Sequence, residues 1–276
     1  MQQVQILDCT LRDGGYQNDC NFGFENQKKI IRGLIEAGVD IIECGFLTNR
    51  VLYHQDVTRF TTPEQVSAVI PSQRSGKLFV LLANFGEYDP NLIPQCNEGT
   101  IDGLRIAFHK KDCKAALADC RLLQDKGYKI FVQAMVSLSY SDEEFLNLIA
   151  QVNALEPYAF YIVDSFGAMK RNDLIRLFYL VEHNLKSSIR VGFHSHNNMQ
   201  LAFSNAQALI DLHSTRNLII DASIYGMGRG AGNLNTELLV EYVNDHAQGS
   251  YNIKPLLTIV DEIIGIFYHK NYWGYS

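Results

Sequence analysis

The sequence has no segment that would place it in or across a membrane. No apolar run approaches the roughly 18 residues needed to span a bilayer, and Met1–Gln5 show no basic segment followed by an apolar stretch. The six cysteines form no C-x-x-C pair and are too sparse for a disulfide framework in 276 residues. We therefore expect a cytoplasmic protein with reduced thiols.

Blocks of positive charge are also missing. The formal charge is -6, the pI is about 5.7, and the 24 lysines and arginines are scattered along the chain. Because nucleic acids and anionic membranes are attracted by basic patches, we expect neither as a partner. The segment Asp8–Gly15, at the end of the first predicted strand, also lacks the G-x-G-x-x-G pattern of a doubly wound dinucleotide-binding sheet. This absence disfavours the doubly wound fold.

Short β-rich runs alternate with longer amphipathic runs along the chain, which is typical of βα units and a parallel sheet. The predicted strands are Val4 to Leu11, Ile41 to Phe46, Leu78 to Ala83, Gly103 to Phe108, Lys129 to Val136, Phe160 to Asp164, Arg190 to His194 and Leu218 to Ile224. The predicted helices are Asn26 to Ala37, Pro63 to Ile70, Asn91 to Gln95, Lys111 to Lys126, Asp142 to Leu155, Asn172 to His183 and Gln200 to Leu212, with an eighth that begins near Asn235.

Eight such units in one chain predict an α/β fold of the TIM (β/α)8 barrel class. We expect residues 1–276 to form a single domain, with an additional C-terminal helix at about 255–268 packing outside the barrel. Ser141 is a predicted helix cap, and Gly38 and Gly127 are predicted to end helices.

Active-site groups of such barrels lie at the C-terminal ends of the strands and in the loops that follow. The polar residues at these positions are Arg12 and Asp13, Glu43, Arg105 and His109, Gln133, Asp164 and Ser165, and His194 and His196. A glycine-rich loop, Gly226–Asn233, follows the last strand and contains Gly228 and Arg229. We predict that Glu43, Arg105, Gln133, Gly228 and Arg229 bind substrate.

His194 and His196 point the same way on a strand, because alternate side chains share a face. Two hydrogen-bonded strand histidines are the alternative to a metal site. Asp13 can complete the ligand set, because strands one and seven of a barrel flank strand eight, and Asn233 can add an amide oxygen. Such donors suit Mn or Mg, with Zn possible. Beside them, Arg12 could stabilise an enolate oxygen, although Arg12 and Asp13 could also form a surface ion pair.

Four segments resemble motifs of the DRE-type TIM-barrel metallolyase superfamily: Leu7–Gly14, Asp164–Gly167, Gly192–Asn197 and Gly226–Asn233. That superfamily is HMG-CoA lyase-like and includes 4-hydroxy-2-oxovalerate aldolase, 3-hydroxy-3-methylglutaryl-CoA lyase and the 2-isopropylmalate synthases. The last loop is most similar to the 4-hydroxy-2-oxovalerate aldolase-like branch. The resemblance implies that Asp13, His194 and His196 bind the metal, with Asn233 a fourth ligand. It also implies that Arg12 steadies the enolate and that Asp164 lies close to substrate or metal-bound water.

Two departures from the aldolase pattern concern the base and the C-terminus. Those aldolases carry a histidine three residues after the metal-binding aspartate, where this chain has Tyr16. Their helical C-terminal domain, which docks a partner dehydrogenase, is expected to be absent or truncated here. The end of the chain, 271–276, is aromatic, and we interpret it as a dimer or lid element or as the cut edge of a longer protein.

The leading hypothesis is a divalent-metal-dependent aldolase that cleaves or forms a C–C bond next to a 2-keto acid through a metal-bound pyruvate-type enolate. Tyr16, His109 or a metal-bound water would move the proton. The expected partners are a small 2-keto acid, an aldehyde and a second copy of the chain in a homodimer. A Claisen-type transferase that condenses an acyl-CoA with a 2-keto acid is the first alternative. A non-catalytic metal-binding barrel is the second.

Overall fold

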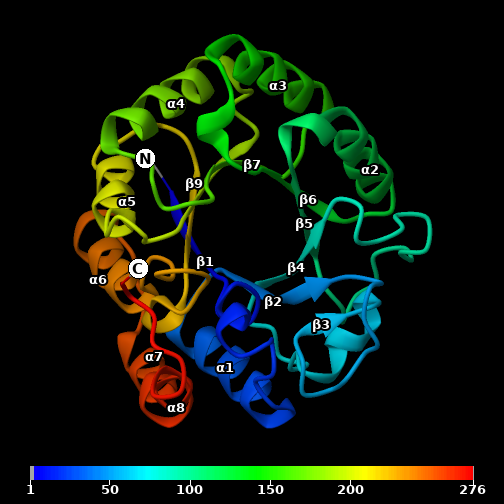
Figure 1. Ribbon diagram of the computed structural model, residues 1–276, viewed down its shortest axis with the longest axis vertical. Helices are drawn as coiled ribbons and strands as arrows, with labels where there is room; N and C mark the ends of the chain where they lie inside the picture. Colours follow the sequence, from blue (N-terminus) through cyan, green and yellow to red (C-terminus); the bar gives the residue numbers. More distant parts are fainter. Residues whose placement is uncertain (1–2, 276) are drawn as a thin grey trace.

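Eight parallel strands close into a barrel in the computed structural model, which describes residues 3–275 (Figure 1). They are β1 (Val4–Asp8), β2 (Ile41–Leu47), β4 (Leu78–Asn84), β5 (Gly103–Phe108), β6 (Lys129–Ala134), β7 (Ala159–Asp164), β8 (Arg190–Ser195) and β9 (Leu218–Ala222). The ring closes because β1 pairs with both β2 and β9. A short strand, β3 (Arg59–Phe60), pairs only with β2 and lies outside the ring. The predicted TIM barrel is confirmed, and Met1, Gln2 and Ser276 of the predicted domain lie outside the described residues.

The barrel strands are apolar on both faces because one face packs inside the ring and the other meets the helices. In β1, Leu7 belongs to the interior cluster, whereas Ile6 belongs to the core between strands and helices. The interior cluster also contains Ile41, Phe131 and Ile219. Polar side chains replace this apolar packing toward the C-terminal ends of the strands, where the candidate site lies.

Helices surround the ring of strands (Figure 1). They are α1 (Phe24–Ala37), α2 (Cys113–Asp125), α3 (Asp142–Leu155), α4 (Arg171–Asn184), α5 (Ala202–Ile210) and α6 (Thr236–His246), with a 3-10 helix η2 (Pro63–Ala68) after β3. The predicted cap is confirmed at α3, where the Ser141 hydroxyl accepts a hydrogen bond from the backbone N–H of Glu144 and the Glu144 carboxylate accepts one from the backbone N–H of Ser141.

The predicted helix from Asn91 to Gln95 is wrong, and the one from Pro63 to Ile70 is a shorter 3-10 helix. Asp89 explains part of the first error, because its side chain accepts hydrogen bonds from the backbone N–H and the side chain of Asn91 and forms a turn. Pro94 also removes a backbone donor from this short segment. The connection between β4 and β5 therefore has no helix.

The C-terminal helix predicted at about 255–268 is confirmed, with an irregular centre. It comprises α7 (Ile253–Ile259), a π-helical turn (Val260–Ile264) and α8 (Gly265–Tyr268). Figure 1 shows α7 and α8 beside α1, outside the barrel. No helix within residues 3–275 is both long and apolar enough to cross a membrane.

Asp8, at the end of β1, is fully buried and joins β1 to α6. Its carboxylate accepts hydrogen bonds from the hydroxyl of Thr236 (2.6 Å) and the backbone N–H of Thr10 (2.9 Å). Burial raises the pKa of Asp8 to about 6, although these two hydrogen bonds oppose the shift. The carboxyl group therefore holds its proton more tightly in the folded protein than in the unfolded chain.

This shift predicts a contribution to stability that falls with rising pH. Between pH 4 and 6 the folded state binds more protons at Asp8 than the unfolded state, so the contribution of Asp8 to the free energy of unfolding decreases across this window and is constant above it. Urea unfolding at pH 4 and pH 7 gives the change in the free energy of unfolding between these pH values. For the metal-free protein and for Asp8→Asn, this change should differ by on the order of 3 kcal/mol. An identical pH response in the two proteins would contradict the prediction.

Candidate metal centre and active site

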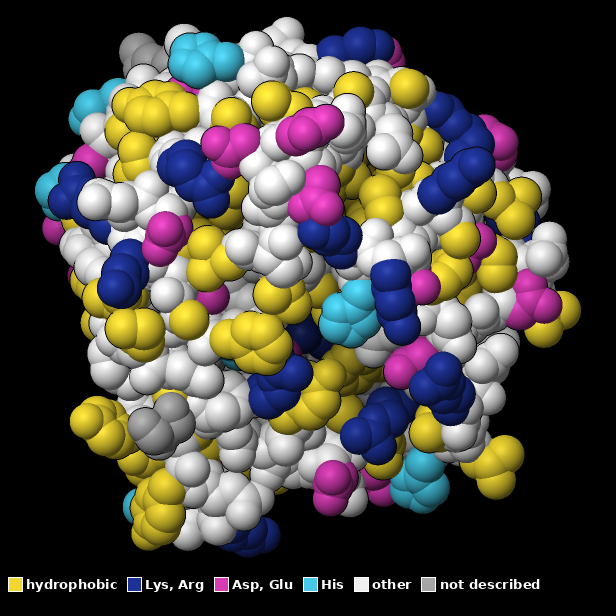
Figure 2. All heavy atoms as spheres, turned by 45° about the horizontal axis from the view of Figure 1, so that its top comes forward, with side chains coloured by type: hydrophobic (Ala, Val, Ile, Leu, Met, Phe, Trp, Pro, Cys, Tyr) yellow, Lys and Arg dark blue, Asp and Glu magenta, His cyan; other side chains and the backbone are white. Residues whose placement is uncertain are grey.

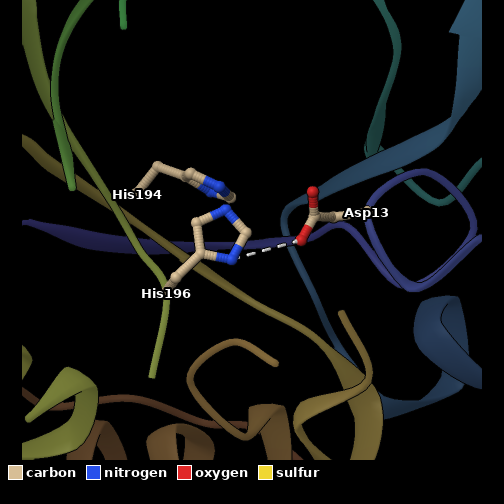
Figure 3. A group of neighbouring side chains, drawn as sticks. All are labelled: Asp13, His194 and His196. Atoms are coloured by element: carbon tan, nitrogen blue, oxygen red, sulfur yellow. Dashed lines mark ion pairs between the residues drawn. The ribbon is translucent and has the colours of Figure 1, made fainter. Parts of the chain in front are cut away.

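Asp13, His194 and His196 converge at the C-terminal end of the barrel (Figure 3). One ligand atom from each lies within 4.8 Å of the others. His194 is in β8 and His196 directly follows it, whereas Asp13 is in the loop after β1. That loop begins earlier than the sequence predicts, because the backbone carbonyl of Cys9 accepts from the N–H of Asp13 (2.8 Å) and turns the chain. The three side chains all face one small space.

The charges of these side chains suit a divalent cation. Burial lowers the pKa of His196 to about 4, although the carboxylate of Asp13 opposes the shift, so the imidazole is neutral near pH 7. Burial by itself would raise the pKa of Asp13, but Arg12 and the two imidazoles hold it well below its usual range. A carboxylate beside imidazole nitrogens is a typical donor set for a metal.

Two buried polar atoms beside this triad have no hydrogen-bond partner within residues 3–275: His196 Nδ1 and Asn233 Oδ1. His196 Nδ1 lies 3.8 Å from Asp13 Oδ2, beyond hydrogen-bond range. The amide nitrogen of Asn233 is engaged, because it donates to Asp13 Oδ2 (2.7 Å) and to the carbonyl of Met227 (3.2 Å). Leaving buried polar atoms unpaired costs folding free energy. A cation bound by His196 Nδ1 and Asn233 Oδ1 would give both atoms a partner, so these residues fit a metal site. Mn or Mg suits this mixture of nitrogen and oxygen donors, and Zn is compatible.

Gly228 explains how the glycine-rich loop approaches the triad. A Cβ atom at this position would lie 2.3 Å from Asn233 Nδ2 and 2.9 Å from Asp13 Oδ2. A side chain there would displace both groups, so the loop needs glycine for close packing. Gly228 therefore supports the ligands, and it does not line the pocket where we expected it to bind substrate.

A buried ion-pair chain connects two of the triad residues through the barrel interior. It consists of Asp13, Arg12, Glu43, Arg105, Asp221 and His194. Arg12 donates to Asp13 Oδ1 (2.5 Å) and, through Nε, to Glu43 Oε2 (2.8 Å). Arg105 Nη1 lies 2.8 Å from Glu43 Oε1 and Nη2 pairs with Asp221.

Asp221 is the last carboxylate of this series of ion pairs and contacts His194, with Asp221 Oδ2 lying 2.9 Å from His194 Nδ1. A carboxylate on one ring nitrogen orients the imidazole and leaves the other nitrogen, Nε2, for a metal. The sequence analysis missed Asp221, although a lone carboxylate within the apolar strand β9 is a usable signal.

Glu43 and Arg105 lie beneath the pocket and are fully buried. Neither lines the inner pocket, and both form ion pairs within the chain of charges that connects Arg12 and His194. Gln133 lines the inner pocket and contacts the buried ion pairs. In the amide orientation that satisfies its hydrogen bonds, its oxygen accepts from Arg105 Nη2 (2.7 Å).

The inner pocket is a cavity of about 70 Å³ above the triad. Of the predicted site residues, Arg12, Tyr16, Gln133 and Arg229 line it together with Asp13, His194 and His196. Its apolar wall, which the sequence analysis did not identify, consists of Phe46, Leu82, Ala107, Met135 and Val163.

Asp164 and His109 lie apart from the inner pocket. The two carboxylate oxygens of Asp164 accept from the backbone N–H groups of Ala168 and Met169, both 3.0 Å, and so hold the loop before α4. Burial raises the pKa of Asp164, opposed by these hydrogen bonds. His109 is exposed and lines only a wider cavity outside the inner pocket.

Tyr16 and Arg229 stand where the inner pocket opens outward. The Arg229 guanidinium carbon lies 6.0 Å from the centre of the Tyr16 ring, and the guanidinium donates to the carbonyl of Ser165 (2.7 Å). The Tyr16 ring also packs edge-on against Phe46, with centroids 5.7 Å apart. Both side chains therefore line the inner pocket and the wider cavity outside it.

The aromatic C-terminal segment packs against the glycine-rich loop of the same chain. Trp273 is 5% exposed and donates through Nε1 to the carbonyl of Tyr225 (2.9 Å). The N–H of Gly274 donates to the carbonyl of Ala231 (3.0 Å). The segment thus holds the loop that carries Arg229 and Asn233.

Replacing Trp273 should loosen this loop. In Trp273→Ala, backbone amides of residues 226–233 should exchange with solvent at least about tenfold faster, because the packing and the hydrogen bond are both lost. Hydrogen exchange read by mass spectrometry measures this directly. The matched variant Trp273→Phe keeps the ring but not the N–H, and should show a smaller effect. Unchanged loop exchange in Trp273→Ala would disprove the anchoring role.

Comparison with known proteins identifies the family. A family model described as HMGL-like matches residues 108–261, more than half of the chain. The 4-hydroxy-2-oxovalerate aldolase of Geobacillus genomosp. 3 is 31% identical over 246 residues, covering 87% of this chain and 70% of that protein. The N-terminal domain of a proposed aldolase from Bacteroides vulgatus superposes with a TM-score of 0.80 at 26% identity, over 99% of this chain and 89% of that one.

The HMG-CoA lyase of Bacillus subtilis shares the fold at 14% identity, with a TM-score of 0.77 over 97% of this chain and 94% of that one. The predicted resemblance to HMG-CoA lyase-like barrels and aldolases is thereby confirmed. The chain belongs to the HMGL-like family, and it is an aldolase-type enzyme of that family.

Proposed function

We propose that the protein is a divalent-metal-dependent aldolase that interconverts a 4-hydroxy-2-keto acid with a 2-keto acid and an aldehyde. The observation that carries the proposal is the triad of Asp13, His194 and His196 beside the guanidinium of Arg12 at the floor of one pocket. The aldolase relatives, one of them a 4-hydroxy-2-oxovalerate aldolase, support the choice of substrate class. A bound divalent metal supplies Lewis acidity to a carbonyl oxygen.

Cleavage of a 4-hydroxy-2-keto acid needs a base and a site for negative charge. The base takes the proton of the 4-hydroxyl, the bond between carbons 3 and 4 breaks, and the aldehyde leaves. The electron pair remains on the 2-keto acid as an enolate, which then takes a proton at carbon 3. Arg12 supports the enolate oxygen, because Glu43 and Asp13 fix its Nε and Nη1 in place.

Two further pocket residues act on the substrate. Gln133 presents its amide nitrogen to the substrate carboxylate, because its amide oxygen is held by Arg105. Tyr16 relays the proton between the 4-hydroxyl and solvent, since it is the acid–base side chain shared by the inner pocket and its opening. Burial raises the pKa of Tyr16, so its hydroxyl is protonated at neutral pH and suited to protonating the product oxygen during synthesis. His109 and Asp164, also expected to be catalytic, do not line this pocket.

Tyr16→Phe tests this assignment. Loss of a positioned acid–base group should lower cleavage by about 10²–10⁴-fold while metal binding is retained. The measurements are single-turnover cleavage rates and metal stoichiometry. Tyr272→Phe, which removes a hydroxyl from an exposed ring, is the control and should cleave at the normal rate. If Tyr16→Phe cleaved as fast as the unmodified protein, another group would have to move the proton.

The proposed function is tested with chelator-treated protein reconstituted with Mn, Mg or Zn. We expect pyruvate release from 4-hydroxy-2-keto acids only in the presence of metal. Metal uptake without pyruvate release from any of these substrates would overturn the proposal. Thiol release from an acyl-CoA in the presence of a 2-keto acid would instead indicate the transferase. No activity in either assay would indicate a non-catalytic barrel. The predicted homodimer is tested separately by light scattering.

A further inference from the structure

A second cavity, the outer cavity, adjoins the inner pocket on the same face of the barrel. Its volume is about 310 Å³, against about 70 Å³ for the inner pocket. The two share Tyr16, Asn84, Ala107, Met135, Ser165 and Arg229, so they are continuous. Figure 2 shows a recess near the centre of one face of the molecule, with hydrophobic and basic side chains around it.

The size of the inner pocket limits what it can hold. A cavity of about 70 Å³ holds roughly five water molecules, which is enough space for a pyruvate-sized group beside Arg12 and the triad. The aldehyde part of a longer substrate must therefore extend past Tyr16 and Arg229. The outer cavity is the space into which it would extend.

Ring faces and hydrogen-bonding groups both line the outer cavity. Phe85 and Phe166 supply rings, and Phe166 is 60% exposed. Asn84, Glu87, His109 and Asp112 supply hydrogen-bonding atoms, and the last two are exposed or partly exposed. The rings can pack against the carbon atoms of a ligand, and the donors and acceptors can pair with its hydroxyl groups. This lining therefore suits a short carbon chain that carries several hydroxyl groups.

The charges around the outer cavity argue against an anionic occupant. Glu87 is paired with Arg50 (3.2 Å), so only Asp112 adds a further negative charge. Arg229 adds one positive charge, which Asp112 balances, so the lining has no surplus of positive charge that would bind an anion. A purely apolar aldehyde is also a poor match, because it would desolvate the carboxylate of Asp112 without a hydrogen bond in return.

We propose that the outer cavity is the subsite for the acceptor aldehyde and that it selects an uncharged, hydroxylated aldehyde longer than acetaldehyde. This inference rests on the proposed aldolase function and narrows its substrate class. In the synthetic direction the methyl carbon of pyruvate loses a proton and bonds to the aldehyde carbon. The aldehyde oxygen takes a proton and becomes the 4-hydroxyl, so no other reactant is required.

The test is a panel of aldehydes with pyruvate and the manganese-loaded protein. D-Erythrose and butyraldehyde form the central comparison, because they match in chain length and differ in hydroxyl groups. Acetaldehyde, benzaldehyde and succinic semialdehyde cover the short, aromatic and anionic classes. We expect kcat/KM for D-erythrose to exceed that for each of the others.

Two variants locate the selectivity. Asp112→Asn and Phe166→Ala should each lower the ratio of kcat/KM for D-erythrose over acetaldehyde by about fivefold, since each loses one favourable contact worth about 1 kcal/mol. Asp125→Asn removes the same charge at the opposite end of α2 and should leave the ratio unchanged.

The outcomes separate this proposal from the one on which it rests. Reaction of acetaldehyde with no preference for D-erythrose, or an unchanged ratio in both variants, would overturn the subsite and leave the aldolase function standing. No reaction with any aldehyde would overturn both. A preference for butyraldehyde or benzaldehyde would show that the cavity binds an apolar acceptor and would also overturn the proposal.

Discussion

Replacing His194 or Asp13 with alanine should abolish stoichiometric metal binding and lower aldol cleavage by roughly a thousandfold or more. Each variant removes one of three ligands from a buried set, and a Lewis acid in such a site contributes several kcal/mol to the transition state. In His194→Ala, Asp221 also loses its imidazole partner. Isothermal titration with Mn and metal analysis of the purified protein measure binding, and pyruvate release measures cleavage.

The control for this prediction is an exposed histidine. His54 has a side chain 67% exposed and lies outside both cavities, so His54→Ala should bind metal and cleave normally. Circular dichroism of His194→Ala and Asp13→Ala establishes that the barrel is intact. Undiminished cleavage in either ligand variant would sink the metal-dependent mechanism.

Arg105→Met should be the most destabilising of the substitutions considered. Arg105 is fully buried between the carboxylates of Glu43 and Asp221, and methionine would leave Glu43 with Arg12 alone and Asp221 with His194 alone. Breaking a buried ion pair by removing one partner costs about 3–5 kcal/mol. Urea unfolding should show a loss of this size in the free energy of unfolding.

Two further variants test the cause of this loss. Arg176 forms an ion pair with Asp142 on the surface, so Arg176→Met should cost about 1 kcal/mol or less. The double variant Arg105→Met with Glu43→Gln removes one of the stranded charges and should regain part of the stability. A loss in Arg105→Met no larger than in Arg176→Met would refute the view that these carboxylates depend on Arg105.

Much of the site could be predicted from the sequence, because it depends on local geometry and on the end of the barrel where strands finish. His194 and His196 share a face through the two-residue period of a strand. Asp13 follows the first strand, so closing the barrel brings it near them. The strand order, the barrel and the additional C-terminal helix follow from the same alternation of apolar runs.

The sequence indicates which face of a strand a side chain lies on, but not how deep in the barrel it lies. Glu43 and Arg105 have the right position along the chain for a site, yet both lie below the pocket and bond to other charges. How deep a side chain lies depends on strand tilt and on register with the neighbouring strands, such as Arg105 opposite Leu82 and Phe131. No single strand carries that information.

The sequence by itself determined the barrel and the spacing of the metal-ligand candidates, because both arise from periodicities within short segments. Only the tertiary structure decided that Asp221 orients His194, that the C-terminal segment holds the glycine-rich loop, and that the site divides into an inner pocket and an outer cavity. Each of these features joins residues far apart in the chain, so it exists only after the barrel has closed.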